Sequence, residues 1–267
     1  MLLQLTPASG SSVNALATDQ LAWHFRHVST RDFQFQQFRV RQSASAMKVC
    51  TDATVFGAMA PVTPGGRVLD IGTGTGLLAL MAAQRGAASV DAVEIDPAAA
   101  AEAGENFAQS PWADRLRVIE GDICDPGIPA RDRYDLILCN PPFFADQTES
   151  DDPRRRRARH ADQGFLQQLV AVSAEWLGQR GLFYVLVPVS RVPTLSAMAG
   201  QAGLPLACRT DIQGFAHQSA KLAAVTFTRE HGLPIERCLT VYDAPRQYTA
   251  QSTVYLRDFL LRFAVEE

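Results

Sequence analysis

The tetrapeptide Asn140, Pro141, Pro142 and Phe143 directly follows the apolar run LILC and is a poor continuation of a strand. Proline has no N–H and a fixed φ, and it pushes the preceding residue into an extended geometry, so the segment should be rigid. The Asn140 side-chain oxygen and the Pro141 carbonyl can accept the two hydrogens of an exocyclic amine and stabilise its positive charge as it attacks a methyl carbon. Phe143 can stack on a flipped-out base. We expect amine methylation here; the simpler alternative is a turn that only ends the strand.

A second candidate feature is the stretch DIGTGTG, which places Gly72, Gly74 and Gly76 between an apolar strand and a helix. Glycines there allow a tight turn and let a ligand lie against the main chain at the helix N-terminus. The dinucleotide fingerprint G-x-G-x-x-G counted from Gly72 would need its third glycine at Leu77. Counted from Gly74, it has Gly76 second and Ala79 last, which is only a loose match. Asp70 in the strand would repel a pyrophosphate and suits a cationic ligand, such as one with an aminoacyl group and a sulfonium.

Acidic residues also end the next two predicted strands. Glu94 lies where a carboxylate can accept both hydroxyls of a ribose. Asp122 can accept an adenine amine, and Ile95 and Ile123 add apolar contacts beside these acids. Because open α/β sheets bind ligands at their carboxyl edge, the set predicts a site for S-adenosylmethionine. Each acid taken alone could instead be a helix N-cap or a solvated loop carboxylate.

The elements that must position these residues alternate along the chain from residue 67, which is typical of a doubly wound α/β sheet. Apolar runs predict strands at 67–72, 89–96, 116–122, 134–140, 181–188, 204–212 and 222–230. Helices are expected at 77–85, 98–109, 164–177 and 191–203, with the arginine-rich residues before 164 in a loop. At the C-terminus, Val254, Phe259 and Leu260 have helical spacing and should pack onto the sheet.

The N-terminal part of the chain should form a small cap. Residues 33–40 predict two short strand pieces, and residues 51–60 a helix with Thr51 or Asp52 as N-cap. We therefore expect three parts: a partly ordered extension at 1–30, a cap segment at 31–62 and the main domain at 63–267.

The motifs DIGTGTG, VEID and NPPFF together resemble the class I amino-methyltransferases. Residues 33–62 and the stretch ENFAQSPWADRLRVIEGDI are similar to the bacterial family of tRNA1(Val) (adenine-37-N6)-methyltransferases. The resemblance implies a Rossmann-like class I fold with a mostly parallel seven-stranded sheet, helices on both faces and a small N-terminal cap. It implies N6-methylation of the adenosine on the 3′ side of a valine-tRNA anticodon, with S-adenosylmethionine as cofactor. Carried over, Lys48 and Thr51 would close over the cofactor or the target base.

A run of arginines follows the tetrapeptide by about ten positions and comprises Arg154, Arg155, Arg156, Arg157 and Arg159. Guanidinium groups bind phosphate bidentately, so the run is a candidate arm for docking tRNA. The chain uses arginine for nearly all its positive charge, with Lys48 and Lys221 as its only lysines, so a merely solvated run is the alternative.

Composition narrows the remaining possibilities. A net charge of -3 over 267 residues excludes a uniformly basic nucleic-acid coat protein. Five scattered cysteines without a C-x-x-C pair predict neither a disulfide framework nor a zinc site, and the five histidines lie far apart. No run reaches the length of a membrane helix. We expect a cytoplasmic protein with no metal and no obligate protein partner.

Several other functions stay open on sequence alone. The same two acceptors would serve a glutamine N5-methyltransferase of a release factor, and a DNA adenine or ribosomal RNA guanine is also compatible with the amine chemistry. A non-catalytic RNA-binding protein on a methyltransferase fold is a further alternative. A nicotinamide-dependent oxidoreductase is disfavoured by the glycine register.

Overall fold

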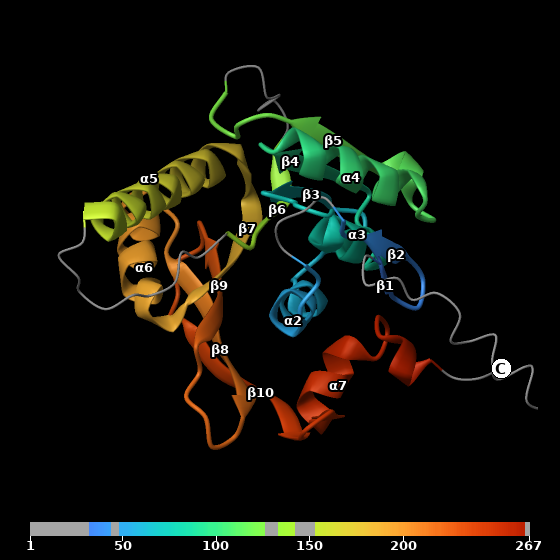
Figure 1. The fold of residues 1–267 in the computed structure, drawn as a ribbon. Helices are drawn as coiled ribbons and strands as arrows, with labels where there is room; N and C mark the ends of the chain where they lie inside the picture. Colours follow the sequence, from blue (N-terminus) through green and yellow to red (C-terminus); the bar gives the residue numbers. More distant parts are fainter. Residues whose placement is uncertain (1–31, 44–47, 126–132, 142–152, 265–267) are drawn as a thin grey trace, which may run out of the picture.

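The structure is a computed structural model that describes residues 32–43, 48–125, 133–141 and 153–264, with the backbone alone for residues 153–163. Nine strands within these ranges form one central sheet, in the order β11-β10-β8-β9-β7-β6-β3-β4-β5 (Figure 1). Their bounds are β3 (Arg67–Ile71), β4 (Ser89–Glu94), β5 (Leu116–Glu120), β6 (Tyr134–Cys139), β7 (Leu177–Pro188), β8 (Leu206–Phe215), β9 (Leu222–Thr228), β10 (Ile235–Ala244) and β11 (Gln247–Tyr248).

Strand direction decides which residues share an edge. Strands β3 to β7 pair in parallel, and β9 runs antiparallel to both β7 and β8. Strand β10 is parallel to β8. The carboxyl ends of β3, β4, β6, β8 and β10 therefore all point to the same edge of the sheet, which is the edge where open α/β folds bind ligands.

Helices cover both faces of the sheet (Figure 1). On one face, α5 (Pro153–Trp176) and α6 (Val192–Gln201) pack over a cluster that includes Leu69 and Ile137. The other face carries a cluster with Val68 and Leu136, covered by α2 (Thr51–Met59), α3 (Leu77–Gln84), α4 (Pro97–Ala108) and α7 (Ala250–Leu256). Adjacent residues of one strand thus enter opposite clusters, which is the two-residue period of a sheet buried on both faces.

This architecture confirms the expected Rossmann-like, mostly parallel sheet with helices on both faces. The predicted strand number was wrong, because β10 and β11 extend the sheet beyond the seven expected strands. The first half of β10, Ile235–Cys238, is exposed, so apolar residues do not alternate there and no strand was predicted.

Three local predictions were also wrong. The arginine run lies in α5, which begins at Pro153 and not at residue 164. The N-cap of α2 is Cys50, with Thr51 as the first helical residue. Val254 is exposed on α7 rather than packed on the sheet, while Leu256 is buried in its place and Phe259 and Leu260 are buried after the helix ends.

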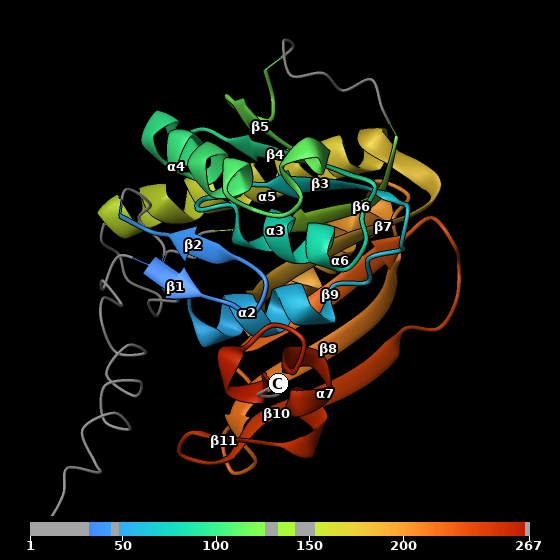
Figure 2. The same cartoon turned by 90° about the vertical axis from the view of Figure 1, so that its right-hand side faces the viewer.

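The predicted N-terminal cap is confirmed as an antiparallel hairpin of β1 (Asp32–Gln34) and β2 (Arg39–Arg41). Stacked Phe35 and Phe38 rings, with centroids 4.5 Å apart, bury the link between the two strands. The hairpin lies beside α2 and α3 on the side of the molecule where α5 begins (Figure 2).

Candidate active site

Three polar residues of the candidate site come together at the carboxyl edge of β3, β4 and β6. Asp70 lies in register with Ala92 on β4 and with Leu138 on β6. Glu94 and Asn140 each follow two residues after these partners. Since strand side chains alternate with a period of two, Asp70 and Glu94 face the same side of the sheet. Asn140 directly follows the last residue of β6 at the same edge.

The loop between β3 and α3 presents its backbone to this edge. Gly72, Gly74 and Gly76 have φ values of 72°, 55° and 82°, which residues other than glycine rarely adopt. A Cβ at Gly76 would lie 2.4 Å from the Phe107 ring, so only glycine fits there. At Gly72 a Cβ would meet no atom within 4 Å, which leaves the loop surface open to a ligand.

A cavity of about 380 Å³, called the large cavity below, lies against this loop. The residues that line it and were predicted from the sequence are Gly72, Gly74, Glu94, Ile95, Asp122, Ile123 and Pro141. Ile95 is 65% exposed and Ile123 is buried. The cavity therefore combines apolar surfaces with three carboxylates, those of Glu94, Asp96 and Asp122. Such a lining suits an adenosine group.

Glu94 is fixed by the backbone on both of its oxygens. Oε2 accepts the N–H of Gly74 at 2.8 Å and Oε1 accepts the N–H of Asp96 at 3.0 Å. Asp96 in turn caps α4 by accepting the N–H of Ala98. Because a carboxylate oxygen has two acceptor positions, Glu94 can still accept a pair of hydroxyls from a ligand.

The side of the large cavity formed by α5 was not predicted. Phe165 and Gln168 line it, together with Cys139 at the end of β6. The α5 residues were interpreted only as part of a helix that covers the sheet. No local motif marks them, since their role depends on where α5 crosses the end of β6.

Asp70 lies beneath the glycine loop and lines neither of the two cavities described here. Its Oδ2 accepts the hydroxyl of Thr73 at 2.6 Å, while its buried Oδ1 has no hydrogen-bond partner among the described residues. Burial raises the pKa of Asp70 to about 7; hydrogen bonding to the Thr73 hydroxyl and to the Ala79 backbone opposes the shift, and the nearby Glu94 charge adds to it. A cation bound over the loop would stabilise the ionised carboxylate.

A smaller cavity, of about 60 Å³, lies on the other side of the loop and is called the small cavity below. Asn140 and Lys48 line it, and it shares Gly72 and Gly74 with the large cavity. The consecutive residues Asn140 and Pro141 thus line different cavities. The end of β6 lies where the two cavities adjoin, so acceptor oxygens from this dipeptide can serve a group held between them.

The two cap-segment residues differ in their placement. Lys48 lines the small cavity, and its ammonium also donates to the Gln42 carbonyl. Thr51 lines neither cavity; its hydroxyl lies 3.1 Å from the hydroxyl of Tyr242 on β10. The cap segment therefore connects the rim of the small cavity to the far end of the sheet.

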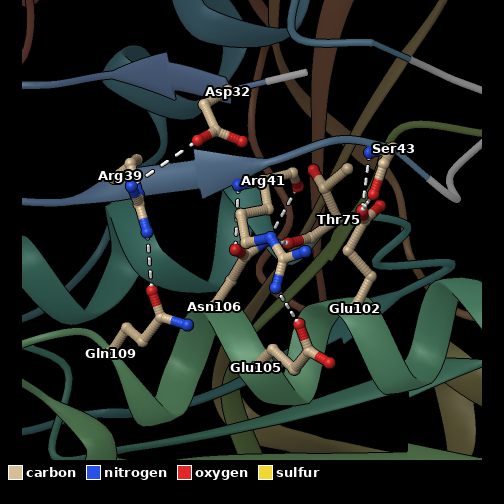
Figure 3. A network of polar contacts seen from close by, with 9 residues as sticks. All are labelled: Asp32, Arg39, Arg41, Ser43, Thr75, Glu102, Glu105, Asn106 and Gln109. Carbon is tan, nitrogen blue, oxygen red and sulfur yellow. Dashed lines mark hydrogen bonds and ion pairs between the residues drawn. The ribbon is translucent and has the colours of Figure 1, made fainter. Parts of the chain in front are cut away.

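A polar network holds the cap hairpin on α4 (Figure 3). The buried Asn106 side chain accepts the Arg41 N–H at 2.9 Å and donates to the carbonyls of Arg41 and Thr75, each at 2.9 Å. Glu102 accepts the backbone N–H and the hydroxyl of Ser43 at 2.6 Å and 2.7 Å. Because Thr75 belongs to the glycine loop, Asn106 ties the cap directly to the loop that both cavities share.

Some predicted residues lie outside the described part of the chain. Pro142 and Phe143 are among them, and of Arg154 to Arg157 and Arg159 only the helical backbone of α5 is described. Over the described ranges, no group of three or more His, Cys, Asp or Glu side chains is arranged to hold a metal ion. A search of the described helices finds none long and apolar enough to cross a membrane.

The side chains gathered at this edge of the sheet fit S-adenosylmethionine. Glu94 and Asp122 are acceptors suited to ribose hydroxyls and an adenine amine, and Ile95 and Ile123 are apolar surfaces for a purine. The unpartnered Asp70 oxygen beneath the loop is suited to a ligand whose other end is cationic. Asn140 and Pro141 add neutral acceptors where a methyl-accepting amine would lie.

Fold and site together define a class I methyltransferase. Residues 45–198 match the methyltransferase small domain family. Among solved structures, a predicted O-methyltransferase from Agrobacterium tumefaciens superposes with a TM-score of 0.58 at 16% identity, over 74% of this chain and 91% of that one. At that identity the likeness shows the fold alone.

Sequence relatives identify the particular family. A tRNA1(Val) (adenine(37)-N6)-methyltransferase from Cytophaga hutchinsonii is 39% identical over 86% of this chain and 97% of its own length. A protein of the same name from Erwinia tasmaniensis is 37% identical over 86% of this chain and 94% of its own. The chain belongs to the family of tRNA1(Val) (adenine(37)-N6)-methyltransferases, as the motifs of the glycine loop, of Glu94 and of Asn140 indicated.

Proposed function

We propose that this chain transfers a methyl group from S-adenosylmethionine to N6 of an adenine in tRNA, at the adenosine on the 3′ side of the anticodon of a valine tRNA. The observation that carries the proposal is the position of Asn140 and Pro141, consecutive residues at the end of β6 that line the two adjoining cavities. The names of the family's curated relatives support the substrate.

The large cavity is the proposed place for the adenosyl part of the cofactor. Glu94, held by two backbone N–H groups, accepts the ribose hydroxyls, and Asp122 accepts the adenine amine. The Asp122 carboxylate is oriented by the N–H of Cys124, which donates to Oδ1 at 2.9 Å. When bound, the cofactor supplies an electrophilic methyl group on a sulfonium.

The end of β6 prepares the acceptor. An adenine amine is a weak nucleophile because its lone pair is delocalised into the ring. The Asn140 side-chain oxygen and the Pro141 carbonyl accept its two N–H groups, which orients the lone pair and stabilises the positive charge that grows on nitrogen. Pro141 is buried and Asn140 half-buried, so water competes little for these hydrogen bonds.

Two further residue sets act on the RNA in this proposal. Phe143 stacks on the target base once it is turned out of the RNA strand. The arginines 154–157 and 159, on the first turns of α5, bind backbone phosphates and dock the tRNA. Lys48 at the rim of the small cavity is positioned to meet the same polyanion.

The test uses Asn140→Ala and Asn140→Gln. Removing one preorganised hydrogen-bonding group costs about 100- to 1,000-fold in turnover. The Gln variant should lose activity as well, because one added methylene displaces the oxygen by about 1 Å or more. Methyl transfer to total tRNA is measured with labelled cofactor, and nucleoside mass mapping locates the product. Cofactor and tRNA affinities should stay within about twofold of the wild type.

Parallel incubations separate the alternatives. Labelling of a release factor instead of tRNA would indicate a glutamine methyltransferase, and RNA binding without any methylation would indicate a non-catalytic protein. Full methylation by Asn140→Ala would refute the mechanism.

A further inference from the structure

A small aromatic cluster lies at the carboxyl edge of the sheet, on β8 and β10. In the sheet order, β9 and β7 separate β8 from β6, the strand that Asn140 follows. Phe215 ends β8, His217 follows in the turn to β9, and Tyr242 lies near the end of β10. Because β8 and β10 run in the direction of β6, these ends belong to the edge that holds the active site. Figure 2 shows β11, the cap hairpin and the start of α5 on this same side of the molecule.

Packing against the hydrophobic core does not account for the position of the Phe215 ring. Its ring is stacked with that of His217, with centroids 5.7 Å apart and planes at 18°, and lies 5.7 Å from the Tyr242 ring. Tyr242 packs against a hydrophobic cluster of the protein, whereas Phe215, among the described residues, belongs to neither cluster and packs against neither. Phe215 is half-buried and His217 is exposed. The pair therefore presents aromatic surface that the core does not use.

The cluster is continuous with the acceptor side of the active site. The Tyr242 hydroxyl lies 3.1 Å from the Thr51 hydroxyl. Thr51 directly follows Cys50, which lines the small cavity together with Asn140. A substrate that extends from the small cavity along the edge would meet Tyr242 first, and then Phe215 and His217.

The surroundings favour an anionic partner. Residues 212–229 contain no Asp or Glu, but they contain His217 and Lys221. Lys221 is exposed and makes no ion pair with the residues that the structure describes. The preceding acid, Asp211, is already paired with Arg209 at 2.7 Å. Asp243 is exposed next to Tyr242, but neighbouring strand residues point to opposite faces.

We propose that Phe215, His217 and Tyr242 form a stacking platform for unpaired nucleotides of the RNA substrate that flank the target adenine. The proposal rests on the proposed function and extends it, because it gives the enzyme a means to select a single-stranded loop over a duplex. Unpaired bases stack on aromatic side chains without regard to sequence, while bases within an A-form helix are already stacked and inaccessible. Lys221 contributes a phosphate contact beside the platform.

The experiment compares binding of two RNAs of equal length and charge, an anticodon stem-loop and a fully paired duplex. Phe215→Ala should weaken stem-loop binding by about fivefold to a hundredfold, the range expected for loss of one base–aromatic stack, and leave duplex binding unchanged. Phe215→Trp should retain stem-loop binding, and Phe215→Leu, apolar but unable to stack, should behave as Phe215→Ala. An unchanged cofactor affinity shows that each variant is folded.

Leu233→Ala is the matched control, because Leu233 is 94% exposed just before β10 at the opposite edge of the sheet. It should bind both RNAs as the wild type does. Lys221→Ala should reduce the dependence of stem-loop binding on salt, whereas Phe215→Ala should not change it.

Several outcomes would overturn the platform: equal loss of stem-loop and duplex binding in Phe215→Ala, full stem-loop binding in that variant, or a loss in Leu233→Ala of the same size. If the wild type binds the stem-loop but methylates no tRNA, the proposed function fails, while the Phe215 series still decides the platform. A wild type that binds neither RNA would refute both.

Discussion

The large and the small cavity share Gly72 and Gly74 but are built in different ways. The large cavity is lined mostly by residues 71–123, which are strand ends, loops and the first turn of α4. Cys139 and Pro141 at the end of β6 and two residues of α5 complete it from a distance. The small cavity gathers residues 48–53, 72–78 and Asn140 from three separate parts of the chain. The proposed cofactor site is therefore formed mainly by one stretch of chain, whereas the small cavity, the proposed acceptor side, depends more on contacts between distant parts of the chain.

The polar groups of the two cavities differ as well. The large cavity presents the carboxylates of Glu94, Asp96 and Asp122, which can accept hydrogen bonds from hydroxyl and amine groups. The small cavity presents the neutral amide of Asn140 and the cation of Lys48. A neutral oxygen can accept hydrogen bonds from an amine while positive charge grows on the nitrogen. Because it carries no full charge, it does not hold a cationic ligand as tightly as a carboxylate would. This division predicts that cofactor affinity and methyl transfer can be impaired separately.

Glu94→Ala gives the largest effect on the cofactor side. The variant loses the proposed acceptor for ribose hydroxyls and leaves the N–H groups of Gly74 and Asp96 without their partner. Hydrogen bonds to a charged group contribute about 1.5 to 3 kcal/mol each, so we expect cofactor affinity to fall about 100-fold. Titration calorimetry with S-adenosylmethionine measures this, and tRNA affinity should be unchanged.

The control for Glu94 is Glu120, its register partner on β5, which is exposed and lines neither cavity. Glu120→Ala should bind the cofactor as the wild type does. A tenfold or greater loss there, or an intact affinity in Glu94→Ala, would show that the carboxylate at the end of β4 is not the ribose acceptor.

Asn106→Ala tests the acceptor side, and its effect should be smaller than the loss of cofactor affinity in Glu94→Ala. It removes three hydrogen bonds at a buried position and leaves the carbonyls of Arg41 and Thr75 without this donor, which should lower the free energy of unfolding by about 2 kcal/mol. Because the cap segment leads to Lys48 at the small cavity, turnover should fall more than cofactor affinity. Chemical denaturation and steady-state kinetics measure the two effects.

Glu105→Ala is the matched control, one position earlier on α4. Its partner Arg41 is exposed, and surface ion pairs contribute about 0 to 1 kcal/mol. A cofactor affinity reduced as much in Asn106→Ala as in Glu94→Ala would mean that the two cavities are not independent.

The positions of residues at the ends of regular strands could be predicted well from the sequence. Apolar runs before Gly72, Glu94 and Asn140 predict the strands. Parallel strands bring their carboxyl ends to one edge of the sheet, so the sequence also predicts that these three residues lie at the same edge. The cofactor and RNA roles of the individual residues stay predictions. The fold class followed from the same alternation.

Other features were not accessible because they depend on packing between distant elements. Phe165 and Gln168 close the large cavity only because α5 crosses the end of β6. Asn106 is an ordinary polar helix residue until β2 is placed on α4. Strand β10 lacks the alternating pattern because its first half is exposed, and the Phe215 cluster at its edge could not be found before that strand was known.

Asp70 lies beneath the loop that separates the two cavities, and its effect should be a dependence of stability on pH. Its pKa is raised from 3.8 to about 7 by burial, so between these values the folded chain binds a proton that the unfolded chain has lost. Stability from this group is complete below about pH 4 and is lost as the pH rises through about 7. The free energy of unfolding should fall by about 1 kcal/mol between about pH 6 and pH 8 relative to Asp70→Asn.

The cofactor should reverse this dependence. A cation bound over the loop favours the ionised carboxylate, so wild-type affinity for S-adenosylmethionine should rise as the pH increases through about 7. Asp70→Asn, which cannot ionise, should bind more weakly above about pH 7 and show a flatter profile. Calorimetry at several pH values on both proteins gives the comparison. Parallel profiles for the two proteins would mean that Asp70 only supports the Thr73 turn and does not interact with the charge of the ligand.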